Sequence, residues 1–291
     1  MEKIVCKFGG TSTANESTAK RVKKIVEANA ARRYIVVSAP GKRFAGDIKI
    51  TDLLYAAAAK AEEKNAKDYR KIFEKVRERF LEIARFSAAD ERFFGDLQSE
   101  LCEIEAKIYA ERNEAFAASR GEYLTAKIFA KLLGVPFIDA ADLIRFTKDG
   151  NLDKTTFNRV QVRLNGVKRA VIPGFYGRGA GGGIHTFPRG GGDITGAVIA
   201  RGVRADLYEN WTDVSGVYEG DPKKNRGAAA LPFLTYAEFA AMSGAKESGG
   251  AGVLHKEAAE IACGAGIPIR ISNTFRPEEK GTLIAFAPAK T

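Results

Sequence analysis

The sequence predicts an α/β fold, a three-layer α/β/α sandwich in which helices cover both faces of a largely parallel sheet. Two observations lead to this prediction. Short apolar runs typical of buried strands alternate along the chain with longer segments whose apolar residues recur at helical spacing. With 291 residues, 45% of them apolar, the chain can bury a large core, as one large or two small domains.

The chain is predicted to begin with two strands and the helix between them. Apolar runs at 4–8 and 34–38 indicate the strands, and residues 15–31 have helical spacing. A loop with proline and glycine, 40–47, follows the second strand.

Helices are predicted for the next part of the chain. Thr51 precedes a helix at 52–64, and its hydroxyl can serve as the N-cap. Residues 119–122 interrupt the helical pattern before a helix at 123–133, so Glu122 either meets a ligand amine or places negative charge at a helix N-terminus. Two amphipathic helices lie between, and their stripes indicate core or a subunit interface: Tyr69, Ile72, Phe73, Val76, Phe80 and Ile83, then Phe94, Leu97, Leu101, Ile104 and Ile108.

The second half of the chain is predicted to complete the sheet. A boundary between two lobes is expected near 150–175. The predicted strands are 135–139, 169–173, 207–211, 267–271 and a terminal edge strand at 281–286. The predicted helices are 193–201, 236–242 and 253–263, and a hairpin is predicted at 144–157 around Asp149, Gly150 and Asn151.

A glycine-rich tract joins the strand at 169–173 to the helix at 193–201. Eight of the sixteen residues from 177 to 192 are glycine, a density that packed strands and helices do not tolerate. A glycine loop between a strand and a helix start suits an anion, because backbone N–H groups and the helix dipole meet there. Arg189 and Asp193, the latter placed as an N-cap, bracket the last three glycines, which argues against a flexible linker.

Lys7 stands near the end of the first predicted strand, just before Gly9 and Gly10. An ammonium group neutralises phosphate oxygens and bare glycine backbone lets them approach, as phosphoryl transfer requires. The spacing of a Walker A loop is absent. From these residues alone, a strand that ends in a solvated lysine and a turn remains an open alternative.

Composition narrows the classes of partner and compartment. The net charge of +10 is spread along the chain, which favours anionic ligands such as a nucleotide over nucleic acid. Cys6, Cys102 and Cys263 are odd in number and far apart, so we expect reduced core cysteines in a cytoplasmic protein. No apolar run approaches the length of a membrane span and the N-terminus lacks a signal-peptide pattern, so neither membrane nor export is indicated.

Three motifs stand in order along the chain: KFGGTS at 7–12, RGGGD at 189–193, and WTDV at 211–214 with Asp221-Pro222. In this combination the chain, from about residue 2 to about residue 285, resembles the catalytic domain of aspartate kinases, in the amino acid kinase superfamily. The resemblance implies one domain over 1–291, with an amino-acid-binding lobe at about 1–170 and a nucleotide-binding lobe at about 171–291.

The same resemblance implies a reaction. The γ-phosphoryl group of MgATP would pass to the side-chain carboxylate of L-aspartate, giving 4-phospho-L-aspartate, the first step towards lysine, threonine and methionine. The nucleophile is already ionised at neutral pH, so the enzyme must mainly hold two polyanions together and spread the developing charge. A cytoplasmic homodimer that uses ATP and Mg²⁺ is the expected form.

Residue roles are carried over from the matching motifs. Lys7 would bridge phosphates with the amides of Gly9 and Gly10, and Asp193 would orient Lys7. The residues expected around aspartate are Arg189 on the α-carboxylate, Glu122 on the α-amino group, and Thr51 and Phe175 as walls. The residues expected around ATP are Thr212, Asp213 and Tyr218 on adenine and ribose, and Lys223 on the phosphates. The metal ligands are not assigned.

Departures from the family pattern bear on these roles. Gly192 stands where many relatives have serine, and Lys223 where arginine is frequent. Gly252 replaces a lysine before Val253-Leu254-His255, and residues 244–250 look like an insertion. His255 is expected to be structural, and His185 is expected to lie on a loop surface. Relatives usually continue into ACT regulatory domains, whereas this sequence ends at Thr291, so we expect an enzyme without that feedback site.

Two alternatives stay open on the sequence. One keeps the fold but changes the acceptor to glutamate, N-acetylglutamate, carbamate or a nucleoside monophosphate, and the pair of Arg189 and Glu122 argues for a free α-amino acid instead. The other is a non-catalytic sensor of a nucleotide or an amino acid, against which Lys7, Arg189 and Asp193 speak.

Overall fold

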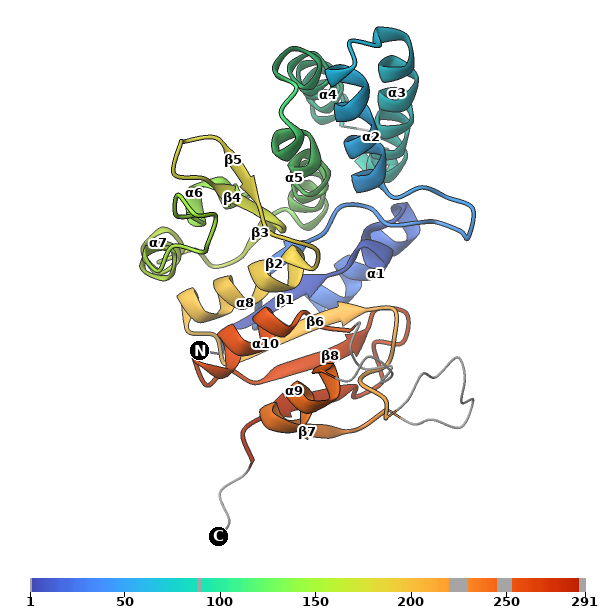
Figure 1. Cartoon of the computed structure of the whole chain (residues 1–291). Coiled ribbons are helices and arrows are strands. Elements are labelled where there is room, and N and C mark those ends of the chain that lie inside the picture. The colour runs from blue at the N-terminus through green and yellow to red at the C-terminus, as the bar shows by residue number, and fades with distance from the viewer. Residues whose placement is uncertain (1, 88–89, 220–229, 245–252, 288–291) are drawn as a thin grey trace.

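The computed structural model describes residues 2–87, 90–219, 230–244 and 253–287, and its centre is a seven-stranded sheet (Figure 1). The strand order is β3-β2-β1-β6-β8-β9-β7, and neighbouring strands are parallel except β8 and β9. The strands are β1 (Ile4–Phe8), β2 (Arg32–Val37), β3 (Ala170–Pro173), β6 (Leu207–Thr212), β7 (Phe233–Thr235), β8 (Ile269–Asn273) and β9 (Thr282–Ala285). The predicted α/β sandwich with a largely parallel sheet is confirmed.

Helices cover both faces of the sheet (Figure 1). One face packs on α1 (Glu16–Glu27), α2 (Ile50–Glu62), α3 (Ala66–Ile83), α4 (Glu91–Glu111) and α5 (Glu114–Leu133). The other face packs on α6 (Ala140–Leu143), α7 (Thr155–Arg163), α8 (Gly191–Val203), α9 (Tyr236–Gly244) and α10 (Lys256–Cys263). The predicted stripes of α3 and α4 lie within the first of these cores, so they are core as expected.

Side chains alternate along β1, and this alternation decides where the polar residues of the strand point. Cys6 and Phe8 belong to the core under α1–α5, whereas Val5 belongs to the core under α6–α10. Lys7 shares the face of Val5 and therefore points toward the layer that contains α8.

Some predicted elements differ in the structure. Residues 135–139 form only a bridge from Phe137 to Val171, and the side chain of Asp139 then caps α6. The hairpin at 144–157 is reduced to a bridge between Phe146 and Leu152, because α7 already begins at Thr155. The strand predicted as a terminal edge is β9, which lies inside the sheet, since β7 pairs with its free side.

The predicted helix starts at Thr51, Asp193 and 119–122 are wrong. Helix α2 begins at Ile50 and α8 at Gly191, so Thr51 and Asp193 lie in first turns rather than at N-caps. Helix α5 runs unbroken through 119–122. Gly121 does not end a helix; a glycine is present there because α2 and the loop after β2 approach this point of α5 closely. The glycine tract also holds a small hairpin of β4 (Tyr176–Arg178) and β5 (Ile184–Thr186), which the glycine density concealed.

The cysteines and the helix lengths bear on two further expectations. All three cysteines are free, and Cys6 is buried, but Cys102 is exposed, so the prediction that all three lie in the core is wrong. Among the described residues, no helix is long and apolar enough to cross a lipid bilayer.

Candidate active site

The strand β1 and the helix α8 bring a lysine and an aspartate into contact. Lys7 Nζ lies 2.6 Å from Asp193 Oδ1, and only about a tenth of either side chain is exposed. Asp193 sits in the first turn of α8, so the positive end of the helix dipole lies beside the pair. The backbone N–H of His255, which starts α10, donates to Asp193 Oδ2 at 3.0 Å and fixes the carboxylate from its other side.

The glycine turn after β1 lies around the ammonium group of Lys7. Gly9 N–H donates to the carbonyl of Trp211 at 3.0 Å, which ties the turn to the end of β6. A Cβ built on Gly9 would lie 3.6 Å from Lys7 Nζ, so the bare backbone leaves room beside the lysine. The chain then enters a short 3₁₀ helix, Gly10–Thr13, with Gly9 at its N-cap.

Ser38 is a nearby residue that the sequence analysis did not single out. A Cβ at Gly192 would lie 2.8 Å from Ser38 Oγ and 3.3 Å from Lys7 Cε. Ser38 therefore brings a hydroxyl to the place that a serine side chain at 192 would take. Its position directly after β2, at the carboxyl edge of the sheet, is the signal that could have identified it.

Glu122 is buried on α5, near the end of β2. A Cβ at Gly121 would lie 2.7 Å from Ala39 Cβ, so a glycine is needed for α5 to come this close to the end of β2. Oε2 of Glu122 has no hydrogen-bond partner among the described residues. Burial raises the pKa of Glu122 to about 8, against the opposite effect of the backbone amides of Ala39 and Glu122 and of the charges of Arg120 and Lys7.

The other residues expected around the amino acid lie on three segments. Phe175 has φ 76° and packs on the RGGGD segment, where a Cβ at Gly191 would lie 2.9 Å from its ring. Thr195 Oγ1 on α8 accepts from Phe175 N–H at 3.0 Å and holds this strained residue. Arg189 is exposed. Tyr55, an exposed phenol on α2 one turn after Thr51, has a pKa raised by partial burial and by the charges of Glu114 and Glu122, against the opposite effect of Arg189.

The residues expected around ATP follow β6. Thr212 ends the strand and its hydroxyl bonds Asp213, which is exposed. Tyr218 pairs with Ala230 through an isolated bridge. Lys223 lies outside the described residues, as do Gly252 and Asp221-Pro222.

The two histidines have packing roles in the structure. His255 caps α10 through Nδ1, and its ring lies against Gly190, where a Cβ would approach within 2.5 Å of the ring. His185 lies on β5 with its ring against Phe146, so it is partly covered rather than free on a loop.

Among residues 2–87, 90–219, 230–244 and 253–287, no group of three His, Cys, Asp or Glu side chains could hold an ion. Mg²⁺ commonly binds through one or two carboxylates together with substrate phosphates, so the arrangement of Lys7, Asp193 and the glycine turn fits a magnesium nucleotide.

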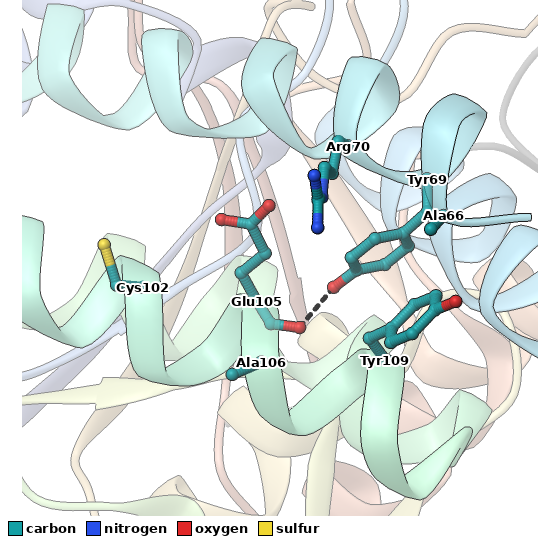
Figure 2. Close-up of a pocket in the computed structure, with 7 residues that line it drawn as sticks. All are labelled: Ala66, Tyr69, Arg70, Cys102, Glu105, Ala106 and Tyr109. Carbon is teal, nitrogen blue, oxygen red and sulfur yellow. Dashed lines mark hydrogen bonds between the residues drawn. The ribbon is translucent and has the colours of Figure 1, made fainter.

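A cavity of about 230 Å³ lies elsewhere, between α3 and α4 (Figure 2). Figure 2 shows Tyr69, whose hydroxyl donates to the carbonyl of Glu105, with Tyr109 alongside. Its lining comes from α3 and α4 alone, so it is separate from the candidate active site.

The fold and the candidate site together define the class: an α/β protein with an open sheet. A lysine, a glycine turn and a helix N-terminus lie at the carboxyl ends of its strands, an arrangement that suits an anion. Residues 2–273 match the model of the amino acid kinase family, and the chain belongs to this family.

Known relatives are similar along nearly the whole chain. Aspartokinase 3 of Bacillus subtilis is 34% identical, over 96% of this chain and 63% of that protein. The crystal structure of Clostridium acetobutylicum aspartate kinase has TM-score 0.88 at 40% identity, over 100% of this chain and 64% of that chain. That of E. coli aspartokinase III in complex with aspartate and ADP has TM-score 0.79 at 25% identity, over 99% and 66%. The chain thus spans just under two thirds of these relatives.

Proposed function

We propose that this protein transfers the γ-phosphoryl group of ATP to the side-chain carboxylate of L-aspartate and forms 4-phospho-L-aspartate, the first step towards lysine, threonine and methionine. The observation that carries the proposal is the buried ion pair of Lys7 and Asp193 beside the glycine turn. Similarity to named aspartokinases, one of them in complex with aspartate and ADP, supports the choice of substrates.

The phosphate side of the mechanism depends on Lys7. Its ammonium group would lie against the transferring phosphate, where negative charge builds up, and the amides of Gly9 and Gly10 would add hydrogen bonds. Asp193 holds the ammonium group in place, and His255 N–H holds Asp193. Mg²⁺, when bound with the nucleotide, supplies further charge neutralisation.

The amino-acid side would select a free α-amino acid. Arg189, exposed at the end of the glycine tract, would bind the α-carboxylate, and Glu122 would bind the ammonium group with its unpaired oxygen. Phe175 and Thr51 would form walls of the same pocket. N-acetylated or phosphorylated acceptors would leave the buried Glu122 without a cation.

The nucleotide side is assigned to Thr212, Asp213, Tyr218 and Lys223. We also propose a division into an amino-acid-binding lobe, about 1–170, and a nucleotide-binding lobe, about 171–291, within a cytoplasmic homodimer. Analytical ultracentrifugation of the purified chain tests the dimer.

The deciding experiment traps acyl phosphate with hydroxylamine. Purified 1–291 is incubated with MgATP and, in separate reactions, L-aspartate, L-glutamate, N-acetyl-L-glutamate and carbamate. Hydroxamate from aspartate alone is the expected result. Product from another acceptor would correct the substrate, and no product with intact ATP binding would indicate a sensor.

Binding of L-aspartate is expected to tighten as pH rises from 6 toward 8. Free Glu122 has a pKa raised to about 8 by burial, so it is largely protonated at pH 6 and must release its proton to receive the ammonium group. One proton released per ligand gives about a tenfold gain in affinity per pH unit below that pKa. Calorimetric titration in buffers of different ionisation enthalpy measures both the affinity and the proton.

The matched control for this prediction is Glu122→Gln, which should bind aspartate weakly and with little dependence on pH. An affinity of the unmodified protein that stays constant from pH 6 to 8 would show that Glu122 is already ionised, or that it does not face the ligand.

A further inference from the structure

Arg79 is a buried cation in an otherwise apolar helix face. It lies on α3 next to Phe80 of the core stripe and is 3% exposed. Its Nη2 donates to Asp47 Oδ2 at 2.6 Å and its Nη1 to the carbonyl of Gly41 at 3.0 Å. Both partners belong to the loop that connects β2 to α2, so the guanidinium joins α3 to this loop.

The loop in turn is joined to the glycine turn of the candidate active site. Gly41 N–H donates to the carbonyl of Gly10 at 2.8 Å. A Cβ at Gly41 would lie 2.7 Å from the carbonyl carbon of Gly10, so the two backbones are in direct contact. The hydroxyl of Thr13 lies within 3.4 Å of the carbonyls of Gly10 and Ala39 and reinforces the same layer.

Burial of the Arg79 guanidinium is energetically unfavourable. Its Nε has no hydrogen-bond partner among the described residues, and burial lowers the pKa of Arg79. Although burial opposes it, hydrogen bonds from Arg43 and the charge of Arg79 hold the pKa of Asp47 well below its usual range. Apolar residues often stabilise a core as well as a buried ion pair does, so helix packing alone does not account for Arg79.

We propose that Arg79 is a positioning residue for the phosphate site: by holding Gly41 and Asp47 it fixes the loop against Gly10 and so sets the backbone amides that follow Lys7. The contacts from Arg79 through Gly41 to Gly10 are observed in the structure, whereas their effect on turnover rests on the proposed kinase function. The variant Arg79→Ala would remove the bond to Gly41 from α3 and leave the ion pair of Arg43 with Glu82 as a remaining link between the loop and this helix.

A cavity beside Arg79 makes chemical rescue feasible. It has a volume of about 200 Å³ and is lined by loop residues, among them Asp47 and Ile48, and by Arg79 and its neighbours on α3. In Arg79→Ala the lost guanidinium would extend this cavity. Guanidinium ion at millimolar concentration can then enter and bond the carbonyl of Gly41 and the carboxylate of Asp47, as the side chain does.

The experiment compares Arg79→Ala with Arg77→Ala. Arg77 is on the same helix, and its ion pairs are with Glu74 of α3 and Glu105 of α4, away from the loop. Hydrogen exchange of residues 38–49 needs no activity: we expect faster exchange in Arg79→Ala, unchanged exchange in Arg77→Ala, and recovery with guanidinium. For turnover we expect a loss of about 100-fold in kcat/KM for ATP, because a misplacement of about 1 Å at a reacting centre costs this much, and recovery by guanidinium.

The outcomes separate the two proposals. Faster exchange with lost and rescuable turnover supports the inference, and so does faster, rescuable exchange if the unmodified chain has no kinase activity. Unchanged exchange at 38–49 would overturn it, and so would, if the unmodified chain is an active kinase, turnover of Arg79→Ala equal to that of Arg77→Ala. If Arg79→Ala does not fold, Arg79→Lys replaces it, and Arg79→Lys must then show the same faster exchange at 38–49.

Discussion

Lys7→Ala is expected to lower kcat for hydroxamate formation by about a hundredfold to a thousandfold while ATP binding falls far less. Removing one charged donor from a transition-state site typically costs this much, because the charge develops during the reaction and not on binding. Without Lys7, the carboxylate of Asp193 would also lose its cation and keep only the hydrogen bond from His255 N–H, so its negative charge would face the phosphates. Turnover by hydroxylamine trapping and ATP binding by calorimetry measure the two effects separately.

The control for this variant is Lys20→Ala, whose ammonium group pairs with Glu16 on the exposed side of α1. It should keep full turnover. Turnover of Lys7→Ala within about tenfold of the unmodified protein would remove Lys7 from the mechanism, because such a loss is below that of a lost transition-state donor. If the unmodified protein and Lys7→Ala both bind ATP but neither shows turnover, the protein is a sensor.

Glu209→Leu is expected to lower the free energy of unfolding by about 3–5 kcal/mol, the usual cost of leaving a buried charge without its partner. Glu209 on β6 is 4% exposed and accepts hydrogen bonds from Arg32 Nε at 2.8 Å and Trp211 Nε1 at 2.9 Å. The thiol of Cys6 on β1 also lies 3.3 Å from it. The network joins β1, β2 and β6, so its loss affects the centre of the sheet. Urea unfolding followed by circular dichroism measures the change.

Two further variants test the reason for that loss. Glu27→Gln breaks the exposed pair with Lys23 and should change stability by less than about 1 kcal/mol. The double variant Arg32→Met with Glu209→Leu removes both charges and should recover much of the loss. If the double variant is no more stable than Glu209→Leu, lost packing rather than the unpaired charge of Arg32 accounts for the effect.

Much of the fold could be predicted because strands and helices leave local patterns. The runs at 4–8, 34–38 and 207–211 became β1, β2 and β6, and the alternation in the first run is what directs Lys7 toward α8. Family resemblance then pointed to the residues of the site, and the structure brings Lys7, Asp193 and the glycine turn together. The roles assigned to them stay predictions.

The rest depended on contacts that a local pattern does not contain. Gly121 indicated a helix break in the sequence. In the structure a glycine is required at this position because α5 packs closely on Ala39. The antiparallel β9 lies inside the sheet because β7, from a distant segment, pairs with it. In the sequence Arg79 is one of several charged residues at 66–83, and only its partners Gly41 and Asp47 in the structure distinguish it.

Trp211 gives the protein a built-in optical probe. It is the single tryptophan of the chain, its ring is stacked on Phe8 at 5.9 Å and is 3% exposed, and its own carbonyl receives Gly9 N–H. The residue that carries the indole also accepts the hydrogen bond from the glycine turn, so a shift of the turn changes the surroundings of the fluorophore. Emission at a single wavelength would therefore report a movement of this turn in real time, without a label.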